Sequence, residues 1–177
     1  LEADTDHELD GVSVRTLPAP GELLCRFATV NDVHFGETEA GHMDGVETPV
    51  MRVPEGAEPY PELMNRCAVA EIAAIDPAAV LVKGDLTAEG TDEEYARFVD
   101  VYGGAFGDRM HHIRGNHDAY RGQTVAPADA VRVDLPGVRL LMIDTTEPFR
   151  AGGGLDGDDL AWLDDNAAGS DVPVLVF

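Results

Sequence analysis

The sequence predicts an α/β fold with a layered, central and largely parallel β-sheet core flanked by helices. Short apolar runs that have the length of buried strands alternate with longer segments of helical periodicity. Such alternation is typical of parallel sheets, because parallel neighbours need a long crossover connection. In addition, 44% of the 177 residues are hydrophobic, which suits a globular core.

The first half of the predicted domain contains two strands and two helices, with a long loop over residues 36–60 that is rich in Gly, Pro and acidic residues. The first helix has one mostly apolar face, which we expect to be buried. The second helix begins with a capping box, Thr91 to Glu94. The elements are expected at residues 23–30 (strand), 62–75 (helix), 78–82 (strand) and 91–102 (helix). The apolar face of the first helix consists of Leu63, Arg66, Cys67, Ala70 and Ala74.

The second half is predicted to add four strands and one helix. A Leu-Pro-Gly turn separates two of these strands, which indicates a hairpin-like pair. Three aspartates at the start of the helix are expected to cap it and to favour its dipole. The elements are expected at residues 110–113 (strand), 131–134 and 138–144 (strand pair), 156–167 (helix) and 172–177 (strand).

The composition limits the partners. A net charge of −22 repels nucleic-acid phosphate, so no nucleic-acid partner is expected. No apolar run approaches the roughly 20 residues that span a bilayer, so no membrane span is expected either. Cys25 and Cys67 are expected to be buried thiols, and one pair of cysteines does not indicate an oxidising compartment. The compartment is therefore left open, with the cytoplasm favoured, and the oligomeric state is not indicated.

Residues 1–21 are predicted to lie outside the domain that residues 22–177 form. Two prolines make Leu17 to Gly21 a stiff linker. The stretch before it resembles the end of a fibronectin type III module, although Ala3 and His7 stand where that module has Pro and Tyr. The alternative is a polar tail with one short strand.

Three predicted strands end in polar clusters, which are Asp32-Val-His34, Gly84-Asp85 and Gly115-Asn116-His117-Asp118. Because ligands of open α/β sheets bind at the carboxyl ends of the strands, we expect these clusters to converge. Carboxylate and imidazole together suit Mn²⁺, Fe or Zn²⁺ better than Ca²⁺ or Mg²⁺. The sequence therefore predicts a transition-metal site at one edge of the sheet.

In this order, the three clusters resemble the motifs of the calcineurin-like metallophosphoesterases. The later stretches L-L-M-I-D-T-T, G-L-D-G-D-D-L-A-W-L and V-P-V-L-V-F are most similar to the branch that contains cyclic-nucleotide and glycerophosphodiester phosphodiesterases. The resemblance covers residues 23–177. It implies a hydrolase that acts on a small phosphate ester, and a phosphodiester is the expected substrate. The attacking group would be a hydroxide activated by two metal ions.

The resemblance also implies roles for individual residues. Asp32 and His34 would hold one ion, Asp85 would bridge both ions, and Asn116 would hold the second. His117 would face the substrate as the catalytic residue. The two cofactor ions are expected to be Mn, Fe or Zn.

The chain departs from the family pattern in two places. The family has a further His after the next strand and a later Gly-His-x-His, whereas this chain ends at Phe177. We therefore expect a fragment that is itself inactive; the alternative is a non-catalytic binding module with the same fold. In many relatives an Asp orients the catalytic His, but Ala88 stands at that position. Asp118 or a backbone carbonyl is left to orient His117.

Three other histidines are expected to have no part in the site. His111 and His112 are adjacent on a strand, so they point to opposite faces and are expected to pack or be solvated. His42 is expected to be a solvated residue of the long loop.

Overall fold

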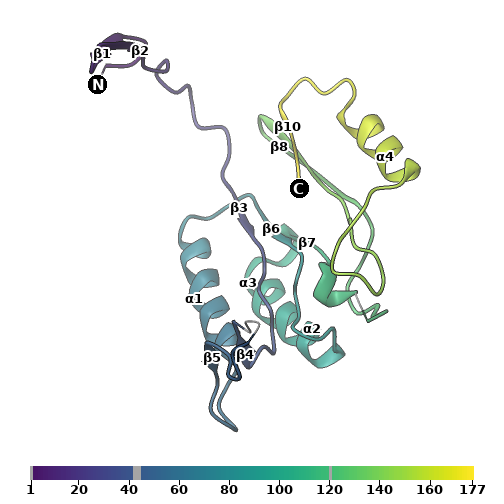
Figure 1. The fold of residues 1–177 in the computed structure, drawn as a ribbon. Helices are drawn as coiled ribbons and strands as arrows, with labels where there is room; N and C mark the ends of the chain where they lie inside the picture. The colour runs from purple at the N-terminus through teal and green to yellow at the C-terminus, as the bar shows by residue number, and fades with distance from the viewer. Residues whose placement is uncertain (1, 42–44, 120) are drawn as a thin grey trace.

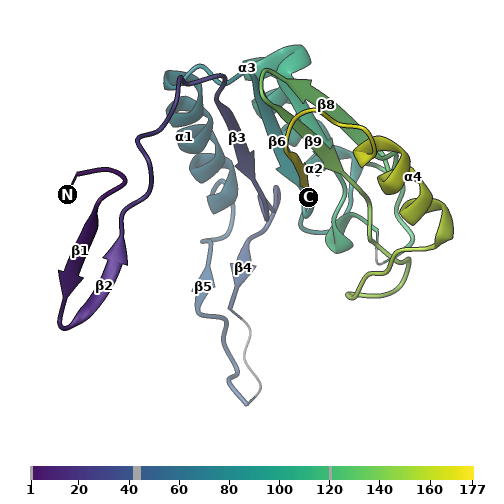
Figure 2. The ribbon, with the colours of Figure 1, turned by 90° about the horizontal axis from the view of Figure 1, so that it is seen from above.

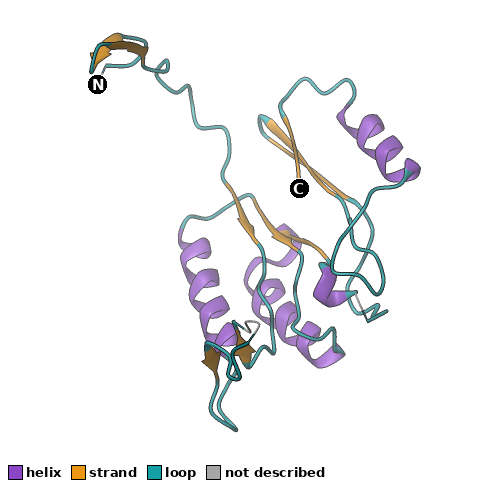
Figure 3. Cartoon of the chain, in the orientation of Figure 1, coloured by secondary structure: helices purple, strands orange, loops and turns teal. Residues whose placement is uncertain are grey.

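The structure is a computed structural model that describes residues 2–41, 45–119 and 121–177; His42 lies outside the described residues. Two three-stranded sheets form its centre (Figures 1 and 3). The first sheet has the order β3–β6–β7, and all of its strands are parallel. It is built from β3 (Phe27–Val30), β6 (Ala79–Lys83) and β7 (Met110–Ile113).

Helical segments cover one face of this parallel sheet. They contribute Phe98, Tyr102 and Phe106 to a buried cluster with Val80 and Val82 of β6. The capping box that the sequence predicts is present, since the Thr91 side chain accepts a hydrogen bond from the backbone N–H of Glu94. The segments are α1 (Tyr60–Ala74), α2 (Asp92–Phe98), the π-helix η1 (Val99–Gly103), α3 (Gly104–Phe106) and the 3₁₀ turn η2 (Gly107–Arg109).

The second sheet packs against the other face of the first. Ala79 and Leu81 of β6 contact Leu140 and Met142 of β9 in a second buried cluster. Strand β6 is thus buried on both faces, as its unbroken apolar run predicts. The sheet has the order β10–β9–β8, in which β8 pairs antiparallel and β10 parallel with β9. Its strands are β8 (Val131–Leu135), β9 (Val138–Met142) and β10 (Val174–Val176).

The layers therefore run from helices through the parallel sheet to the mixed sheet, with α4 (Gly157–Ala167) beyond the latter (Figure 2). The α/β class is confirmed, and its strands are divided between two packed sheets. The Asp156 side chain caps α4 by accepting from the N–H groups of Asp158 and Asp159, as predicted. In the described ranges, none of the helices combines the length and apolar character needed to cross a membrane.

The N-terminal residues form a hairpin that lies apart from these layers in both views (Figures 1 and 2). It pairs β1 (Asp6–Leu9) with β2 (Val12–Arg15), where the sequence predicts at most one short strand. A second small ladder, β4 (Glu39–Ala40) with β5 (Met51–Arg52), interrupts the loop that was expected to be irregular. The boundary between residues 1–21 and 22–177 stays a prediction.

Two expectations about burial were wrong. The buried face of α1 carries Pro61, Glu62 and Asn65, whereas Leu63 of the predicted face is 57% exposed. The buried polar residues bind backbone groups of the β3 loop, so hydrophobicity alone selects the wrong face. For the same reason Cys67 lies exposed on α1, and Cys25 is half-buried; both thiols are free. The first strand also begins later than predicted, since Leu23 and Leu24 are exposed.

Asn65 joins three parts of the fold. Its amide nitrogen donates to the carbonyl of Val33 at 2.8 Å and to that of Pro61 at 2.9 Å. Its amide oxygen accepts from the hydroxyl of Tyr102 at 2.7 Å, and burial raises the pKa of this phenol to about 12, so it remains a donor. Through Asn65, α1 and η1 together hold the loop that follows β3.

The Asn65→Ala variant is expected to lose about 2–4 kcal/mol of unfolding free energy, because the buried Val33 carbonyl and Tyr102 hydroxyl both lose their partner. Urea denaturation measures the loss. The control is Asn166→Ala on α4, which has no buried residue; it removes a bond to the Trp162 carbonyl and a 3.5 Å bond from Arg132, and should cost about 1 kcal/mol or less. Equal losses in the two variants would contradict this account.

Candidate metal centre

The loops after β3, β6 and β7 meet at one edge of the parallel sheet, and three of their residues adopt left-handed backbone conformations. The φ angles are 54° at Asp32, 46° at His34 and 47° at Asp85. Such angles are uncommon outside glycine, although Asp and His are among the residues that tolerate them best. All three residues are predicted metal ligands, so the strained backbone coincides with the predicted site.

Two glycines let the second and third loops touch. A Cβ on Gly84 would lie 3.0 Å from the Cα of Gly115, and one on Gly115 would lie 2.1 Å from the backbone nitrogen of Asp85. A side chain at either position would therefore separate the loops. The glycines of the Gly-Asp and Gly-Asn-His clusters are required by this close approach.

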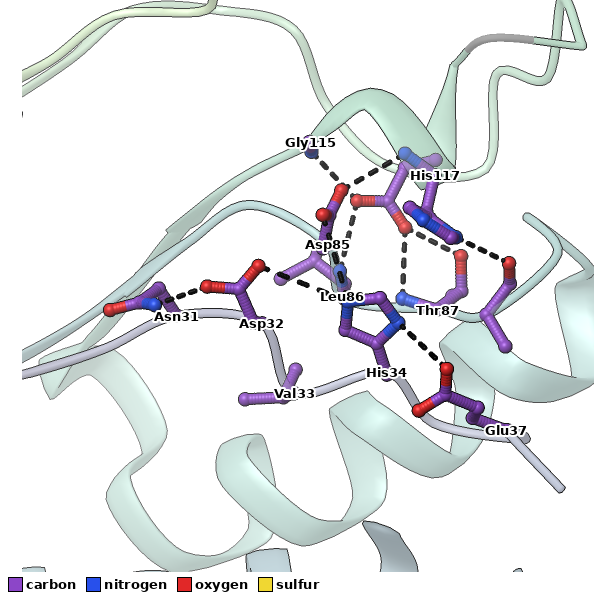
Figure 4. Close-up of polar contacts among 12 residues, drawn as sticks. Asn31, Asp32, Val33, His34, Glu37, Asp85, Leu86, Thr87, Gly115 and His117 are labelled. Atoms are coloured by element: carbon purple, nitrogen blue, oxygen red, sulfur yellow. Dashed lines mark hydrogen bonds and ion pairs between the residues drawn. The ribbon is translucent and has the colours of Figure 1, made fainter. Parts of the chain in front are cut away.

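A fully buried carboxylate fastens the same two loops together. Oδ2 of Asp118 accepts from the N–H groups of Gly115 at 2.8 Å and of Leu86 at 3.0 Å. Oδ1 accepts from the N–H of Thr87 at 2.9 Å and from its hydroxyl at 2.5 Å. Figure 4 labels the donor residues Gly115, Leu86 and Thr87 beside the candidate ligands. All four donors come from the loops that follow β6 and β7.

The candidate ligands lie close to one another at the same edge of the sheet. Nε2 of His34 lies 3.6 Å from Oδ2 of Asp85 and 3.9 Å from Oδ1 of Asp32. One ligand atom each from His34, Asp85 and His117 fall within 4.8 Å of one another. The rings of His34 and His117 meet edge to face, with centroids 4.6 Å apart. The structure thus brings His117, which sequence reasoning assigned to the substrate, into the same cluster as the ligands.

His117 is oriented by a backbone carbonyl. Its Nδ1 lies 2.8 Å from the carbonyl oxygen of Ala88, and because a carbonyl can only accept, Nδ1 carries the proton. A ligand, base or acid role would then fall to Nε2. The backbone N–H of His117 also donates to Oδ1 of Asp85 at 2.9 Å. Of the two orienting groups that the sequence left open, the carbonyl is the one in contact.

Charge interactions couple His34 and Asp85. The contact with Asp85 raises the pKa of His34, with Glu37 and Asp32 adding to the effect and burial opposing it. Burial works to raise the pKa of Asp85, but His34 and the N–H of His117 outweigh it, and the pKa is lowered. Without a metal, the two groups therefore form an ion pair over a wider pH range than free side chains would.

Glu37 is a residue of the site that sequence reasoning missed. Its Oε1 lies 3.9 Å from Nδ1 of His34, on the side of the ring away from Asp85 (Figure 4). Its Oε2 accepts from the hydroxyl of Tyr60. Nδ1 of His34 is buried and has no hydrogen-bond partner among residues 2–41, 45–119 and 121–177. A carboxylate three residues after the imidazole was the only signal in the sequence.

A pocket of about 260 Å³ opens beside the cluster, between the carboxyl ends of the two sheets. Asp32, Asp85 and Asn116 line it, so Asn116 shares a cavity with the ligands that sequence reasoning grouped with it. The remaining walls come from the ends of β6 and β7, from the loop after β9 and from the residue after β10. They are Lys83, Gly84, Ile113, Arg114, Gly115, Ile143, Thr145, Thr146, Ala151, Gly152, Gly153 and Phe177.

Comparison with known proteins identifies this arrangement. Residues 25–176 match the family described as calcineurin-like phosphoesterase. The chain belongs to that family. A protein of Synechococcus sp. (strain ATCC 27144 / PCC 6301 / SAUG 1402/1), named probable cyclic nucleotide phosphodiesterase, is 30% identical over 161 residues. The match covers 88% of this chain and 57% of that relative, so the chain spans little more than half of the relative's length.

A solved structure supports the fold independently. A dimetal phosphatase from Danio rerio superposes with a TM-score of 0.62 at 17% identity, over 88% of this chain and 69% of that one. The layered arrangement of this calcineurin-like phosphoesterase is therefore that of a dimetal phosphatase, and the calcineurin-like resemblance drawn from the three clusters is confirmed.

The donor set suits metal ions of the kind that a dimetal phosphoesterase holds. It combines imidazole nitrogen with carboxylate oxygen, a mixture that favours transition metals over Ca²⁺ and Mg²⁺. One ligand atom each from His34, Asp85 and His117 lies close enough to share an ion, and these side chains are half-buried, whereas Asp32 is 62% exposed. Which metal the phosphoesterase holds stays a prediction.

The pH dependence of the metal-free phosphoesterase tests the ion pair. His34 has a raised pKa in the folded state, so its stabilisation is complete below the unfolded value of about 6.5 and is lost as pH rises through the folded pKa. Asp85 has a lowered pKa, so its share is present above about 3.8 and is lost as pH falls through the folded pKa. Both contributions are complete between these two values.

In Asp85→Asn, the pKa of His34 is expected to fall, because the largest cause of its rise is removed. NMR titration of the imidazole in metal-free protein measures it. The matched change is Asp32→Asn, which should lower the pKa less, since Asp32 is 62% exposed and farther from Nε2. A larger effect from Asp32 than from Asp85 would contradict this ranking.

Asp118→Asn is expected to cost about 3–5 kcal/mol of unfolding free energy, because the amide NH₂ would face backbone donors and leave two of them unsatisfied. Urea denaturation again provides the measurement. Asp129→Asn, an exposed loop change of the same kind, is the control and should stay within about 0.5 kcal/mol of wild type. A loss at Asp118 no larger than that of the control would show that this carboxylate does not hold the loops.

Proposed function

We propose that the protein is a metal-dependent phosphodiesterase. The observation that carries the proposal is the convergence of His34, Asp85 and His117 within 4.8 Å at the ends of three parallel strands. The name of the Synechococcus relative supports a phosphodiester substrate rather than a monoester. The substrate class is a small phosphate ester that reaches the pocket beside Asp85 and Asn116.

Each residue has a proposed role. Asp32 and His34 would hold one ion, Asp85 would contribute to both, and Asn116 would hold the second through its side-chain oxygen. When bound, the ions supply positive charge to the phosphoryl oxygens and lower the pKa of the attacking water. This positive charge also offsets the repulsion that a chain of net charge −22 exerts on an anionic ester.

His117 is the proposed catalytic residue. Because Nδ1 donates to the Ala88 carbonyl, the ring is held with Nε2 on the opposite side. A protonated Nε2 can donate to a phosphoryl oxygen or give its proton to the leaving alkoxide. The N–H of His117 donates to Asp85, so the acid and the bridging ligand are positioned together.

We further propose that residues 1–177 hold only part of the ligand set. The chain spans 57% of the length of its Synechococcus relative, which leaves room for the family's later histidines in a longer protein. Within these residues, the Asn116 side would have only Asp85 and an amide oxygen. Oxygen donors alone bind transition metals weakly, because imidazole carries much of the preference.

Residues 1–177 alone are therefore expected to bind one Mn²⁺ at most, at the position of Asp32 and His34, with negligible turnover. Isothermal titration calorimetry measures the stoichiometry. The His34→Gln variant should lose the binding, since it removes the imidazole donor. Two ions bound at full occupancy would contradict the proposal for this part of the chain.

The full-length gene product that contains these residues is expected to hydrolyse bis-p-nitrophenyl phosphate when Mn²⁺ is added and to lose this activity in chelator. Asp85→Asn should lower kcat by about 10²-fold or more, because a ligand shared by both ions is lost. The control is Asp165→Asn on the exposed surface of α4, which should turn over like wild type. Full activity in chelator would refute metal dependence.

The second candidate is a non-catalytic binding module that keeps the fold. It is favoured by Ala88, which stands where many relatives carry an orienting Asp. In that case the full-length protein would bind Mn²⁺ but would not turn over any diester. The comparison of metal binding with turnover in one preparation separates the two candidates.

A further inference from the structure

Two basic side chains share the pocket with the candidate ligands. Lys83 ends β6 and Arg114 follows β7, and both line the cavity that Asp32, Asp85 and Asn116 also line. Neither has a place in the proposed metal chemistry. Their position in the wall of this pocket therefore calls for a separate explanation.

Lys83 is the only lysine of the chain. It follows Ala79 and Leu81 on the face of β6 that points to the second sheet, and it is half-buried. Among the described residues its ammonium group has no ion pair, and it lies over the ring of Phe177, 5.2 Å from the centroid. A cation–π contact leaves the positive charge uncompensated, so the charge remains available to an anion.

Arg114 is held in place from one side. Its Nε donates to Oδ2 of Asp144 at 2.5 Å, and Oδ1 of Asp144 accepts from the N–H of Thr146 at 2.7 Å. Both side chains are largely buried, at 16% and 9% exposure. Within the described residues, the terminal nitrogens of the guanidinium have no hydrogen-bond partner. They form a fixed pair of donors of the kind that binds carboxylate or phosphate.

These two cations stand out against the rest of the molecule. The net charge is −22, and most arginines form ion pairs at exposed positions, as Arg15, Arg52, Arg66 and Arg150 do. In a low-dielectric pocket, a positive charge acts more strongly on a ligand than at the surface. The scissile phosphate would be neutralised by the metal ions, so the cations suit a different anionic group.

We propose that Lys83 and Arg114 form an anion subsite that selects phosphodiesters carrying a second anionic group, a carboxylate or a further phosphate, on one ester arm. This inference rests on the proposed function, because it assigns the substrate class of the same site. The scissile phosphate lies at the metal cluster, and the second anion contacts the ammonium group of Lys83 and the terminal nitrogens of Arg114.

The test uses two esters that differ in one group, namely 4-carboxyphenyl 4-nitrophenyl phosphate and 4-carbamoylphenyl 4-nitrophenyl phosphate. With the full-length protein and Mn²⁺, the KM of the carboxylate ester is expected to be about 10-fold lower, as for a charge-assisted hydrogen bond. Lys83→Met should remove most of this preference, and Lys83→Arg should retain it. The ratio of the two KM values is compared, so a uniform loss of activity does not affect the result.

The matched control is Arg66→Met. It also removes one positive charge, but from an exposed ion pair that Arg66 of α1 forms with Glu58. It should keep the preference of wild type. If wild type does not prefer the carboxylate ester, or if Lys83→Met keeps the preference, the subsite is refuted. If Arg66→Met loses the preference as well, the effect comes from net charge and the subsite is equally refuted.

A binding measurement separates this inference from the proposed function. If neither ester is hydrolysed, the phosphodiesterase proposal fails, but calorimetry still compares the affinity of the two esters. Tighter binding of the carboxylate ester that Lys83→Met abolishes would support the subsite without turnover. Equal affinities, or no measurable binding of either ester, would overturn it.

Discussion

The site depends on one buried carboxylate. Asp118 accepts four hydrogen bonds from the loops after β6 and β7, and with them it fixes the distance between Asp85 and His117. A carboxylate can do this where an amide cannot, because it offers acceptors only, and every group that faces it is a donor. Asn65 fixes the loop that carries His34 in the same way, by donating to the carbonyl of Val33. These two buried polar side chains add to backbone bonds between the loops, such as the one that the N–H of His34 donates to the carbonyl of Asp85 at 2.9 Å.

The strand ends explain why a site can form here at all. β6 is buried between two layers, so its direction is fixed by packing on both faces. Its parallel neighbours end at the same level, because Val30 pairs with Val82 and Val82 with His112. Each following loop therefore starts from a rigid point. The packed core therefore fixes where each loop begins, and the polar side chains of the cluster, which lie outside the core, are positioned by it.

The sequence could predict what depends on local order and not what depends on contacts across the fold. Asp32, Asp85 and Asn116 lie within three residues of the ends of apolar runs, so their convergence could be expected. The buried face of α1 could not be, because Asn65 is buried for its hydrogen bonds and not for its hydrophobicity. Nor could the orientation of His117, which depends on a backbone carbonyl 29 residues away in the chain. The roles of the site residues themselves stay predictions.

The left-handed backbone at Asp32, His34 and Asp85 has a consequence for evolution. Glycine adopts that conformation at less cost than any other residue, so at each of these positions the side chain is kept against a conformational preference. Selection for thermal stability alone would favour glycine at such positions. The protein would gain stability and lose the predicted ligands. At these three positions, selection for stability and selection for metal binding would therefore act in opposite directions.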